Sequence, residues 1–191
     1  GYETVQKRLS SRNSFDSTMT NLRPFRLDDL FHFNTVNLDP FTETYGLSFY
    51  LQYLTQWPEY FHTAESPWGE IMGYIMGKVE GSGTNWHGHV TALTVGPQYR
   101  RLNLAAKLMY CLELTSERKL AYFVDLFVRV SNSIAINMYK NLGYTVYRQV
   151  LEYYTGDPDE DAYDMRKALS KDKEKKSIIP LPHPVKITDL E

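Results

Sequence analysis

The sequence predicts a mixed α/β domain in which helices cover both faces of a central sheet. The chain has 191 residues, and its content of 42% hydrophobic and 23% charged residues is enough for one buried core. Strand-like and helix-like spacings of apolar residues alternate along it. Breakers that contain Gly or Pro separate these segments. Together the three observations favour a single α/β domain.

Each element follows from its local pattern of apolar residues and breakers. Strands are expected at 22–27, 60–64, 70–79, 86–95, 122–130, 143–154 and 162–167, and helices from Asp28 to the Asp39-Pro40 stop, at 48–57, at 101–119 and at 131–142. The breakers at 67–69 and 81–83 are typical of hairpins, so the strands between 60 and 95 should form an antiparallel meander. The result is a mostly antiparallel sheet of about seven strands flanked by about four helices.

The two ends of the chain differ in composition from the middle. Residues 1–18 are polar and serine-rich without a sustained period, so we expect a non-native or disordered extension before Met19. Residues 19–169 then form the domain. Residues 170–191 begin with the charged run SKDKEKK and hold three prolines. They are interpreted as a C-terminal tail, either loose or docked.

Composition excludes several classes of protein. Lys plus Arg total 21 and Asp plus Glu total 23, for a net charge of −2, which argues against a nucleic-acid partner. A single cysteine, Cys111, excludes a disulfide framework. No apolar run approaches the roughly 20 residues that span a bilayer, so no membrane partner is expected. These features predict a soluble, cytoplasmic protein.

The segment 95–108 (VGPQYRRLNLAAKL) predicts an anion site. A turn between a strand and a helix directs backbone N–H groups and the helix dipole at one spot, which suits a pyrophosphate. Arg100 and Arg101 add positive charge, and Ala105 and Ala106 allow close approach. The segment is neither a Walker A loop nor a dinucleotide fingerprint. The alternative is an ordinary helix with basic residues near its start.

These residues resemble a known signature. The string RRLNLA at 100–105 resembles the R/Q-x-x-G-x-G/A pattern of the GNAT superfamily of N-acetyltransferases, which holds the pyrophosphate of acetyl-CoA. Asn103 replaces the middle glycine, and because asparagine tolerates the left-handed conformation, we expect the turn to persist. The resemblance implies a GNAT fold and these residues at acetyl-CoA: Leu93, Val95, Arg100, Arg101, Asn103, Leu104, Ala105, Ala106, Asn132, Asn137 and Tyr139.

Longer strings resemble one family within that superfamily. They include LDPFTETYG (38–46), WHGHVTAL (86–93), FVDLFVRVSN (123–132) and KKSIIPLPHPV (175–185), and the resemblance covers 19–191. The family that these strings resemble is the catalytic subunits of NatB-type N-terminal acetyltransferases. It implies acetyl transfer from acetyl-CoA, without a metal, to the α-amino group of nascent proteins that begin Met-Asp, Met-Glu, Met-Asn or Met-Gln. It also implies a large helical auxiliary subunit that contacts the ribosome.

Two other functions stay open at this point. The chain could acetylate another class of N-terminus or lysine, or it could be a CoA-binding subunit without turnover. A panel of Met-X peptides tests the first alternative. Acetylation of a Met-Asp peptide with and without the auxiliary subunit tests the second.

Tyr139 is the candidate catalytic acid. It lies on the apolar stripe of the helix 131–142 and falls at the tyrosine position of the superfamily. Its phenol would protonate the departing thiolate, and the alternative is a core tyrosine with a satisfied hydroxyl. A backbone N–H of residues 93–95 would hold the oxyanion. An α-amino group has a pKa of about 7.7–8, so only a modest base is needed.

His87, His89 and Thr91 share one face of a strand because side chains alternate. A zinc site would need further ligands, and no cluster suggests them. A second interpretation is a pair of buried, satisfied histidines. In the third, His89 and Thr91 line the peptide cleft, and the resemblance implies that His89 donates to the side chain of the second substrate residue.

Two loops are expected to close over the peptide. Glu43 and Tyr45 lie between the first two helices, and Tyr153 and Tyr154 precede the acidic turn at 156–161. Both tyrosines reach the cleft only if the strand ends or bulges there, and otherwise one packs and one is exposed. Glu43 is a weak candidate for the base, or it solvates the loop.

The first two predicted helices carry many aromatic side chains. They are Phe31, Phe33, Phe49, Tyr50, Tyr53 and Trp57. Since aromatic residues are enriched in interfaces, we expect part of this set to form a partner surface.

Overall fold

The centre of the molecule is a mixed sheet of eight strands. The computed structural model describes residues 20–33, 36–37 and 43–190, and within them the strand order is β1-β2-β3-β4-β5-β7-β6-β8. The strands are β1 (Asn21–Pro24), β2 (Phe61–Glu65), β3 (Ile71–Glu80), β4 (His87–Val95), β5 (Phe123–Arg129), β6 (Thr145–Tyr154), β7 (Glu160–Ala168) and β8 (Val185–Lys186). Among the described strands only β4 with β5 and β6 with β8 pair in parallel, so the predicted fold class is confirmed.

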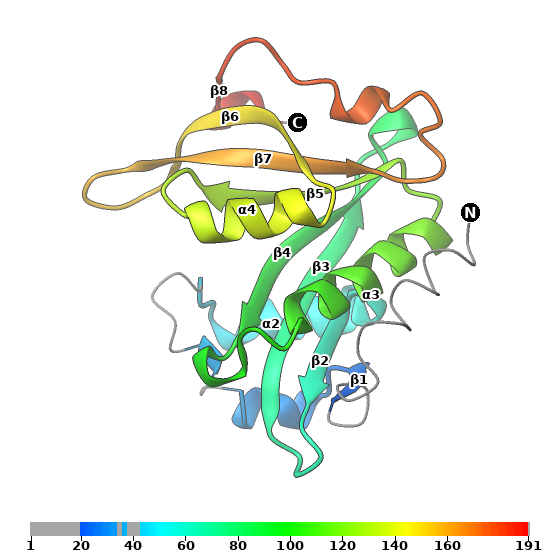
Figure 1. The fold of residues 1–191 in the computed structure, drawn as a ribbon, viewed down its shortest axis with the longest axis vertical. Coiled ribbons are helices and arrows are strands. Elements are labelled where there is room, and N and C mark those ends of the chain that lie inside the picture. The colour runs from blue at the N-terminus through cyan, green and yellow to red at the C-terminus, as the bar shows by residue number, and fades with distance from the viewer. Residues whose placement is uncertain (1–19, 34–35, 38–42, 191) are drawn as a thin grey trace.

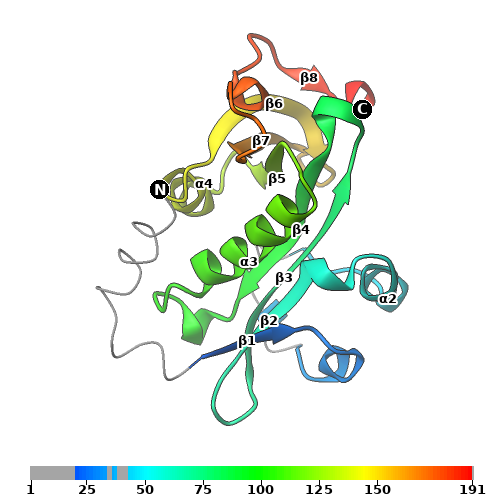
Figure 2. The same ribbon diagram turned by 90° about the vertical axis from the view of Figure 1, so that its right-hand side faces the viewer.

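Helices cover both faces of the sheet, as predicted. Figures 1 and 2 show α3 (Leu104–Arg118) and α4 (Ser133–Asn141) on one face, and α2 (Leu47–Gln56) with the 3₁₀ helix η1 (Leu27–Phe31) on the other. The described residues thus hold three α-helices where about four were expected. The remaining short 3₁₀ helices are η3 (Pro58–Tyr60), η4 (Gly83–Asn85), η5 (Pro97–Tyr99), η6 (Lys176–Ile178) and η7 (Ile187–Asp189).

The first predicted helix is wrong, because the segment forms only the short turn η1. Asp29 accepts a hydrogen bond from the backbone N–H of Arg26 at 2.7 Å. Its carboxylate also accepts two hydrogen bonds from Arg23 of β1, at 2.7 and 2.9 Å. The side chain therefore closes the turn and attaches it to the sheet edge instead of starting a long helix. The predicted stop at Asp39-Pro40 and the predicted extension 1–18 lie outside the described residues.

Two hydrophobic cores lie on the two faces of the sheet. One packs α3 and α4 against β3, β4 and β5, and the other packs η1 and α2 against β2 and β3. Phe33, Tyr50 and Tyr53 are buried in the second core, so most of the aromatic excess is core. Phe31 is the exception, since 72% of it is exposed.

The C-terminal segment 170–190 lies along the edge of the sheet. Val185 and Lys186 of β8 pair with Val150 and Leu151 of β6, and the N–H of Leu181 donates to the Tyr147 carbonyl at 2.7 Å. The segment thereby covers a strand edge that would otherwise be open. In the part of the chain that the structure describes, no helix combines the length and apolarity needed to cross a bilayer.

Candidate active site

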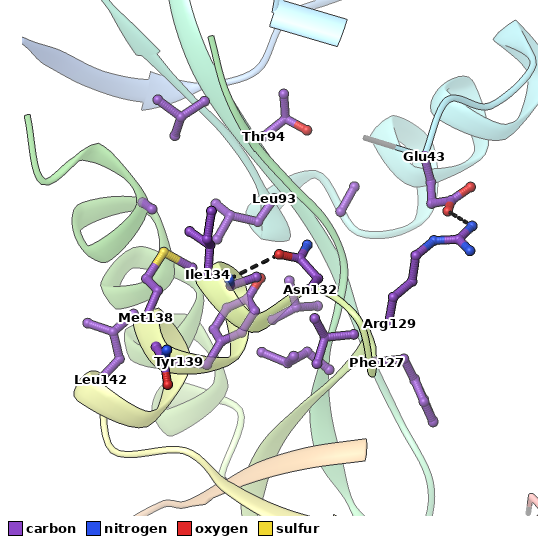
Figure 3. Close-up of a pocket in the computed structure, with 18 of the residues that line it drawn as sticks. Glu43, Leu93, Thr94, Phe127, Arg129, Asn132, Ile134, Met138, Tyr139 and Leu142 are labelled. Atoms are coloured by element: carbon purple, nitrogen blue, oxygen red, sulfur yellow. Dashed lines mark hydrogen bonds and ion pairs between the residues drawn. The ribbon is translucent and has the colours of Figure 1, made fainter. Parts of the chain in front are cut away.

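The sheet splits open between β4 and β5. The two strands pair only from His87 with Phe123 to Val90 with Leu126, and beyond these residues they diverge. A cavity of about 1270 Å³ occupies the split, which exceeds the roughly 300–1,000 Å³ of most small-molecule sites. Figure 3 shows side chains of β4, β5 and α4 around it. This volume leaves room for two substrates.

Every candidate residue predicted from the sequence lines this one cavity. They are Glu43, Tyr45, His89, Thr91, Leu93, Val95, Arg100, Arg101, Asn103, Leu104, Ala105, Ala106, Asn132, Asn137, Tyr139, Tyr153 and Tyr154. The split therefore brings together segments that lie far apart in the sequence. The role of each residue stays a prediction.

A β-bulge in β4 lies inside the cavity. Met76 of β3 pairs with Ala92, and the next residue, Gly77, pairs with Val90, so Thr91 is the extra residue. A bulge interrupts the regular alternation of side chains along a strand. Residues on the two sides of Thr91 can therefore face opposite sides of the sheet.

Because of the bulge, residues from both faces of the sheet line the cavity. Leu93 and Val95 pack against the core under α3 and α4. The Thr91 hydroxyl instead lies 2.8 Å from the Tyr53 hydroxyl of α2. His89 lies on this α2 side as well, because its neighbour Val90 is in the opposite core.

The edge of β4 presents backbone groups to the cavity. The N–H of Gly96 donates to the Met72 carbonyl at 2.9 Å, and hydrogen-bonded pairs alternate along an antiparallel ladder. The N–H groups of Leu93 and Val95 therefore point away from β3 and into the split. Fixed N–H groups in such a position can stabilise an oxyanion, which is the predicted use of residues 93–95.

The first turn of α3 forms the anion-binding corner. The helix begins at Leu104, not at Arg101, because Arg101 and Asn103 both have positive φ, of 68° and 59°. Asn103 thus adopts the left-handed conformation that asparagine was expected to tolerate here. No side chain in the described part of the chain caps this helix start, so the first N–H groups are available to a ligand anion. Ala105 lines the cavity beside them.

Replacing Asn103 tests this turn. Asn103→Ala should destabilise the fold by about 1 kcal/mol, because alanine lacks the tolerance of asparagine for positive φ. The melting temperature should fall by about 2–4 °C, and calorimetry should show weaker acetyl-CoA binding. Asn103→Gly is the matched control and should keep both properties. A variant Asn103→Ala that melts and binds like the unaltered chain would contradict the assignment.

Helix α4 supplies the opposite wall of the corner. The Asn132 side-chain oxygen accepts a hydrogen bond from the Ala135 N–H at 3.1 Å and so caps the helix (Figure 3). The amide NH₂ of Asn132 makes no part of this cap and can donate to a ligand. Asn137 lies on the exposed side of the same helix and also borders the cavity.

Tyr139 lies on the inner side of α4. It is 8% exposed, and its ring meets the edge of Tyr144 at a centroid distance of 5.9 Å. Figure 3 places it in the pocket wall, with Leu93 of β4 across the pocket. Among the described residues its hydroxyl donates to no protein group, and Tyr139 borders the cavity, where a ligand can reach it. Burial raises the pKa of Tyr139, so the phenol keeps its proton at neutral pH.

The loop before α2 reaches the cavity from the other side. The Tyr45 hydroxyl donates to the Thr91 carbonyl at 3.4 Å, and burial raises the pKa of Tyr45 to about 12. Glu43 forms an ion pair with Arg129 of β5, at 2.8 Å between Oε1 and Nη2. The Glu43 carboxylate is thus already engaged by a cation, which weakens its candidacy as the base.

Both Tyr153 and Tyr154 reach the cavity, because β6 bulges before them. Val150 pairs with Ala162 and Tyr154 with Glu160, so β6 holds extra residues between the two pairs. The two tyrosine rings lie 5.0 Å apart. The bulge that both tyrosines need in order to reach the cavity is therefore present. The alternative of one packed and one exposed tyrosine is wrong.

Arg129 joins the two loops at this opening and was missed in the sequence analysis. Besides Glu43, it pairs with Glu160 of β7 at 3.1 Å. Its guanidinium also lies 4.1 Å from the centroid of the Tyr154 ring. One cation thus holds the loop before α2 and the β6–β7 hairpin together.

The two histidines of β4 have different surroundings. His87 is buried, and its ring stacks on Phe123 at 4.7 Å, so the interpretation as a satisfied buried histidine suits it. His89 lines the cavity, and its Nδ1 lies 2.8 Å from Oδ1 of Asp125. No group of His, Cys, Asp or Glu in the described ranges is arranged to hold a metal ion.

Asp125 is the second residue that the sequence analysis missed. It lies on β5 and is 4% exposed. The available signal was a lone carboxylate within the apolar run FVDLFV at 123–128, because buried charges need partners.

The geometry defines a class of protein, an acyltransferase that uses a phosphate-bearing donor. The anion corner and Tyr139 lie on the α3/α4 side, where a donor would be held, and the N–H groups of Leu93 and Val95 point into the split beside them. The aromatic and imidazole groups on the α2 side leave room for an acceptor chain. The residues therefore fit acetyl-CoA and an amine acceptor in one cavity.

Comparisons with known proteins agree with this class. Residues 26–144 match the Acetyltransferase (GNAT) family. The N-terminal acetyltransferase B complex catalytic subunit NAA20 of Arabidopsis thaliana is 60% identical over 174 residues, which cover 91% of this chain and 99% of the plant protein. The crystal structure of Chaetomium thermophilum Naa20 with a bisubstrate analogue has a TM-score of 0.83 at 45% identity, covering 88% of this chain and 97% of that one.

A NatB acetyltransferase complex solved with CoA and MES contains a further similar chain. It has a TM-score of 0.72 and 47% identity, and the match covers 78% of this chain and 99% of that one. The chain therefore belongs to the GNAT acetyltransferase family and, within it, to the catalytic subunits of N-terminal acetyltransferase B.

Proposed function

We propose that this chain transfers the acetyl group of acetyl-CoA to the α-amino group of proteins that begin Met-Asp, Met-Glu, Met-Asn or Met-Gln. It does so as the catalytic subunit of a two-subunit NatB complex. The main support for the proposal is the cavity through the split sheet. It has an anion-binding corner on one side and His89 among tyrosine hydroxyls on the other. The names of the similar proteins support the same activity.

The cavity offers the groups that acetyl transfer needs. The first N–H groups of α3 hold the pyrophosphate, and those of Leu93 and Val95 stabilise the oxyanion. A fraction of an α-amino group with a pKa of about 7.7–8 is already free base at neutral pH. The Tyr139 hydroxyl donates to the departing sulfur. Since a thiol has a pKa of about 8.5, below that of this phenol, the hydrogen bond itself contributes much of the stabilisation.

The auxiliary subunit contacts the exposed apolar side chains beside α2. Leu27, Phe31 and Leu47 are each more than half exposed on η1 and the start of α2. Exposed apolar groups that gather on one side support a protein partner there. Through this subunit the complex contacts ribosomes in the cytoplasm, where it meets nascent N-termini. Co-sedimentation with ribosomes should require both subunits.

An acetylation assay on a panel of Met-X peptides tests the proposal. The purified chain, with and without its auxiliary subunit, should acetylate Met-Asp, Met-Glu, Met-Asn and Met-Gln peptides in preference to Met-Ala or an internal lysine. Equal rates on all peptides would indicate another N-terminal class, and transfer to lysine would indicate a lysine acetyltransferase. CoA binding without turnover in either state would leave only a binding subunit.

Removing the His89 imidazole should weaken the selection of the second residue. His89→Ala should reduce the preference for Met-Asp over Met-Ala by about tenfold or more, since a hydrogen bond to a charged group contributes about 1.5–3 kcal/mol. The measurement is the ratio of kcat/KM for the two peptides. His62→Ala on β2 is the control, and its ratio should not change. An unchanged ratio in His89→Ala would give that histidine a structural role only.

A further inference from the structure

The buried carboxylate of Asp125 fixes which nitrogen of His89 carries a proton. Oδ1 of Asp125 lies 2.8 Å from Nδ1 of His89, and the carboxylate is 4% exposed. Because an ionised carboxylate only accepts hydrogen bonds, Nδ1 of His89 must be the donor. The other ring nitrogen, Nε2, is then left for the cavity that His89 lines.

This arrangement limits what Nε2 can do. In a neutral imidazole with the proton on Nδ1, Nε2 is only an acceptor. It can accept from the NH₂ group of an Asn or Gln side chain, but it repels the carboxylate of Asp or Glu. In the imidazolium both nitrogens donate, so Nε2 then binds a carboxylate or an amide oxygen.

We propose that Asp125 is a positioning residue through which His89 recognises an acidic second residue only as the imidazolium, while it recognises an amide second residue in both protonation states. The inference rests on the proposed function, since it concerns the second residue of the same peptide. The site should therefore prefer acidic substrates at low pH and lose that preference as the pH rises.

The Asp125 carboxylate keeps His89 protonated to higher pH, and further charged groups surround this His89–Asp125 pair. Burial alone would lower the pKa of His89, but the charge and hydrogen bond of Asp125 outweigh it and raise that pKa. Burial likewise favours neutral Asp125, yet His89 lowers its pKa below the ordinary value. The titratable and charged groups near the pair are His87 on β4, Lys78 and Glu80 on β3, Asp164 and Arg166 on β7, Tyr53 on α2, Tyr144 just before β6 and Tyr153 on β6.

His87 does not compete for the hydrogen bond of His89. Its Nδ1 donates to the Asn85 carbonyl at 2.6 Å, and its Nε2 lies 3.6 Å from Oδ2 of Asp125, beyond hydrogen-bond distance. The two histidines therefore approach different oxygens of the Asp125 carboxylate, and of the two only His89 hydrogen-bonds to it.

The pH dependence of specificity tests the proposal. For the two-subunit complex, kcat/KM is measured on Met-Asp and Met-Asn peptides from pH 6 to 9. The α-amino group and acetyl-CoA are common to both reactions, so their titrations cancel in the ratio. Above the pKa of His89 the ratio of Met-Asp to Met-Asn should fall by up to about tenfold per pH unit. A constant ratio over this range would overturn the proposal.

The variant Asp125→Asn separates positioning from a merely structural role. The amide oxygen can still accept from Nδ1, but the charge is gone, so the fall in the ratio should move to lower pH. If Asp125 had only a structural role, Asp125→Asn would lower kcat/KM equally for Met-Asp and Met-Asn. The ratio of the two would then keep the pH dependence of the unaltered complex. His87→Gln removes the other ring that faces Asp125 and should keep the pH dependence of the unaltered complex.

Nitrogen NMR of the full chain gives a readout that does not depend on activity. The spectra should show His89 with its proton on Nδ1 and with a raised pKa, which falls in Asp125→Asn. A neutral form with the proton on Nε2 would overturn the proposal. Absence of turnover on every peptide would instead refute the proposed function, and the NMR result would still decide the role of Asp125.

Discussion

Replacement of Tyr139 by phenylalanine should lower kcat about 10²–10³-fold and leave the affinity for acetyl-CoA nearly unchanged. The change removes one hydroxyl from the cavity wall and keeps the ring that packs on Tyr144. The hydroxyl acts on the departing sulfur, where negative charge develops only in the transition state, so turnover suffers more than binding. Steady-state kinetics with a Met-Asp peptide and calorimetry with CoA measure the two effects.

Tyr144→Phe is the matched control for this prediction. Its hydroxyl donates to Glu113 at 3.0 Å, and Tyr144 is buried next to Tyr139 without lining the cavity. Loss of this hydroxyl should cost about 1–2 kcal/mol of stability and leave kcat nearly intact. Equal kinetics of Tyr139→Phe and the unaltered enzyme would remove Tyr139 as the catalytic donor.

The largest effect on stability is expected at Asp164 of β7, which is fully buried. It accepts a hydrogen bond from Arg148 at 2.8 Å and two from Arg166, at 3.3 and 3.1 Å. Asp164→Ala would leave the buried Arg166 without its carboxylate partner, at a cost of about 3–5 kcal/mol. For a chain of this size the melting temperature should fall by roughly 6–20 °C in thermal unfolding.

The control for Asp164 is the exposed carboxylate of Asp28. Asp28→Ala, in the first turn of η1, should change stability by no more than about 0.5 kcal/mol. If Asp164→Ala had the same melting temperature as Asp28→Ala, the buried Arg166 would not depend on the Asp164 carboxylate for stability.

Local patterns predicted most of the fold. Alternation and helical stripes placed the strands and the two helices that frame the cavity, because the segments between 60 and 154 are strongly periodic and clearly separated by breakers. The start of α3 was placed three residues early. Arg101 fits a helical stripe in the sequence, but the turn places it at positive φ before the helix begins. The first helix failed because Asp29 pairs with Arg23, a contact that periodicity does not encode.

The candidate site could also be predicted in part, because its residues lie in recognisable local sequence segments. The resemblance placed its candidates on segments that the fold brings to one cavity, and the bulge that admits both Tyr153 and Tyr154 was recognised as a requirement. Asp125 and Arg129 were missed because their importance depends on pairing between distant strands. Only the register of β4 with β5 places Asp125 opposite His89, and no local pattern fixes that register.

A structure of the chain with a CoA–Met-Asp peptide conjugate would locate both substrates in the cavity. The pyrophosphate should lie within hydrogen-bond distance, about 2.7–3.2 Å, of the first N–H groups of α3. The linked peptide should lie on the α2 side, with its aspartate at Nε2 of His89. A peptide bound on the α3/α4 side, or an aspartate directed away from His89, would refute the proposed arrangement of the site.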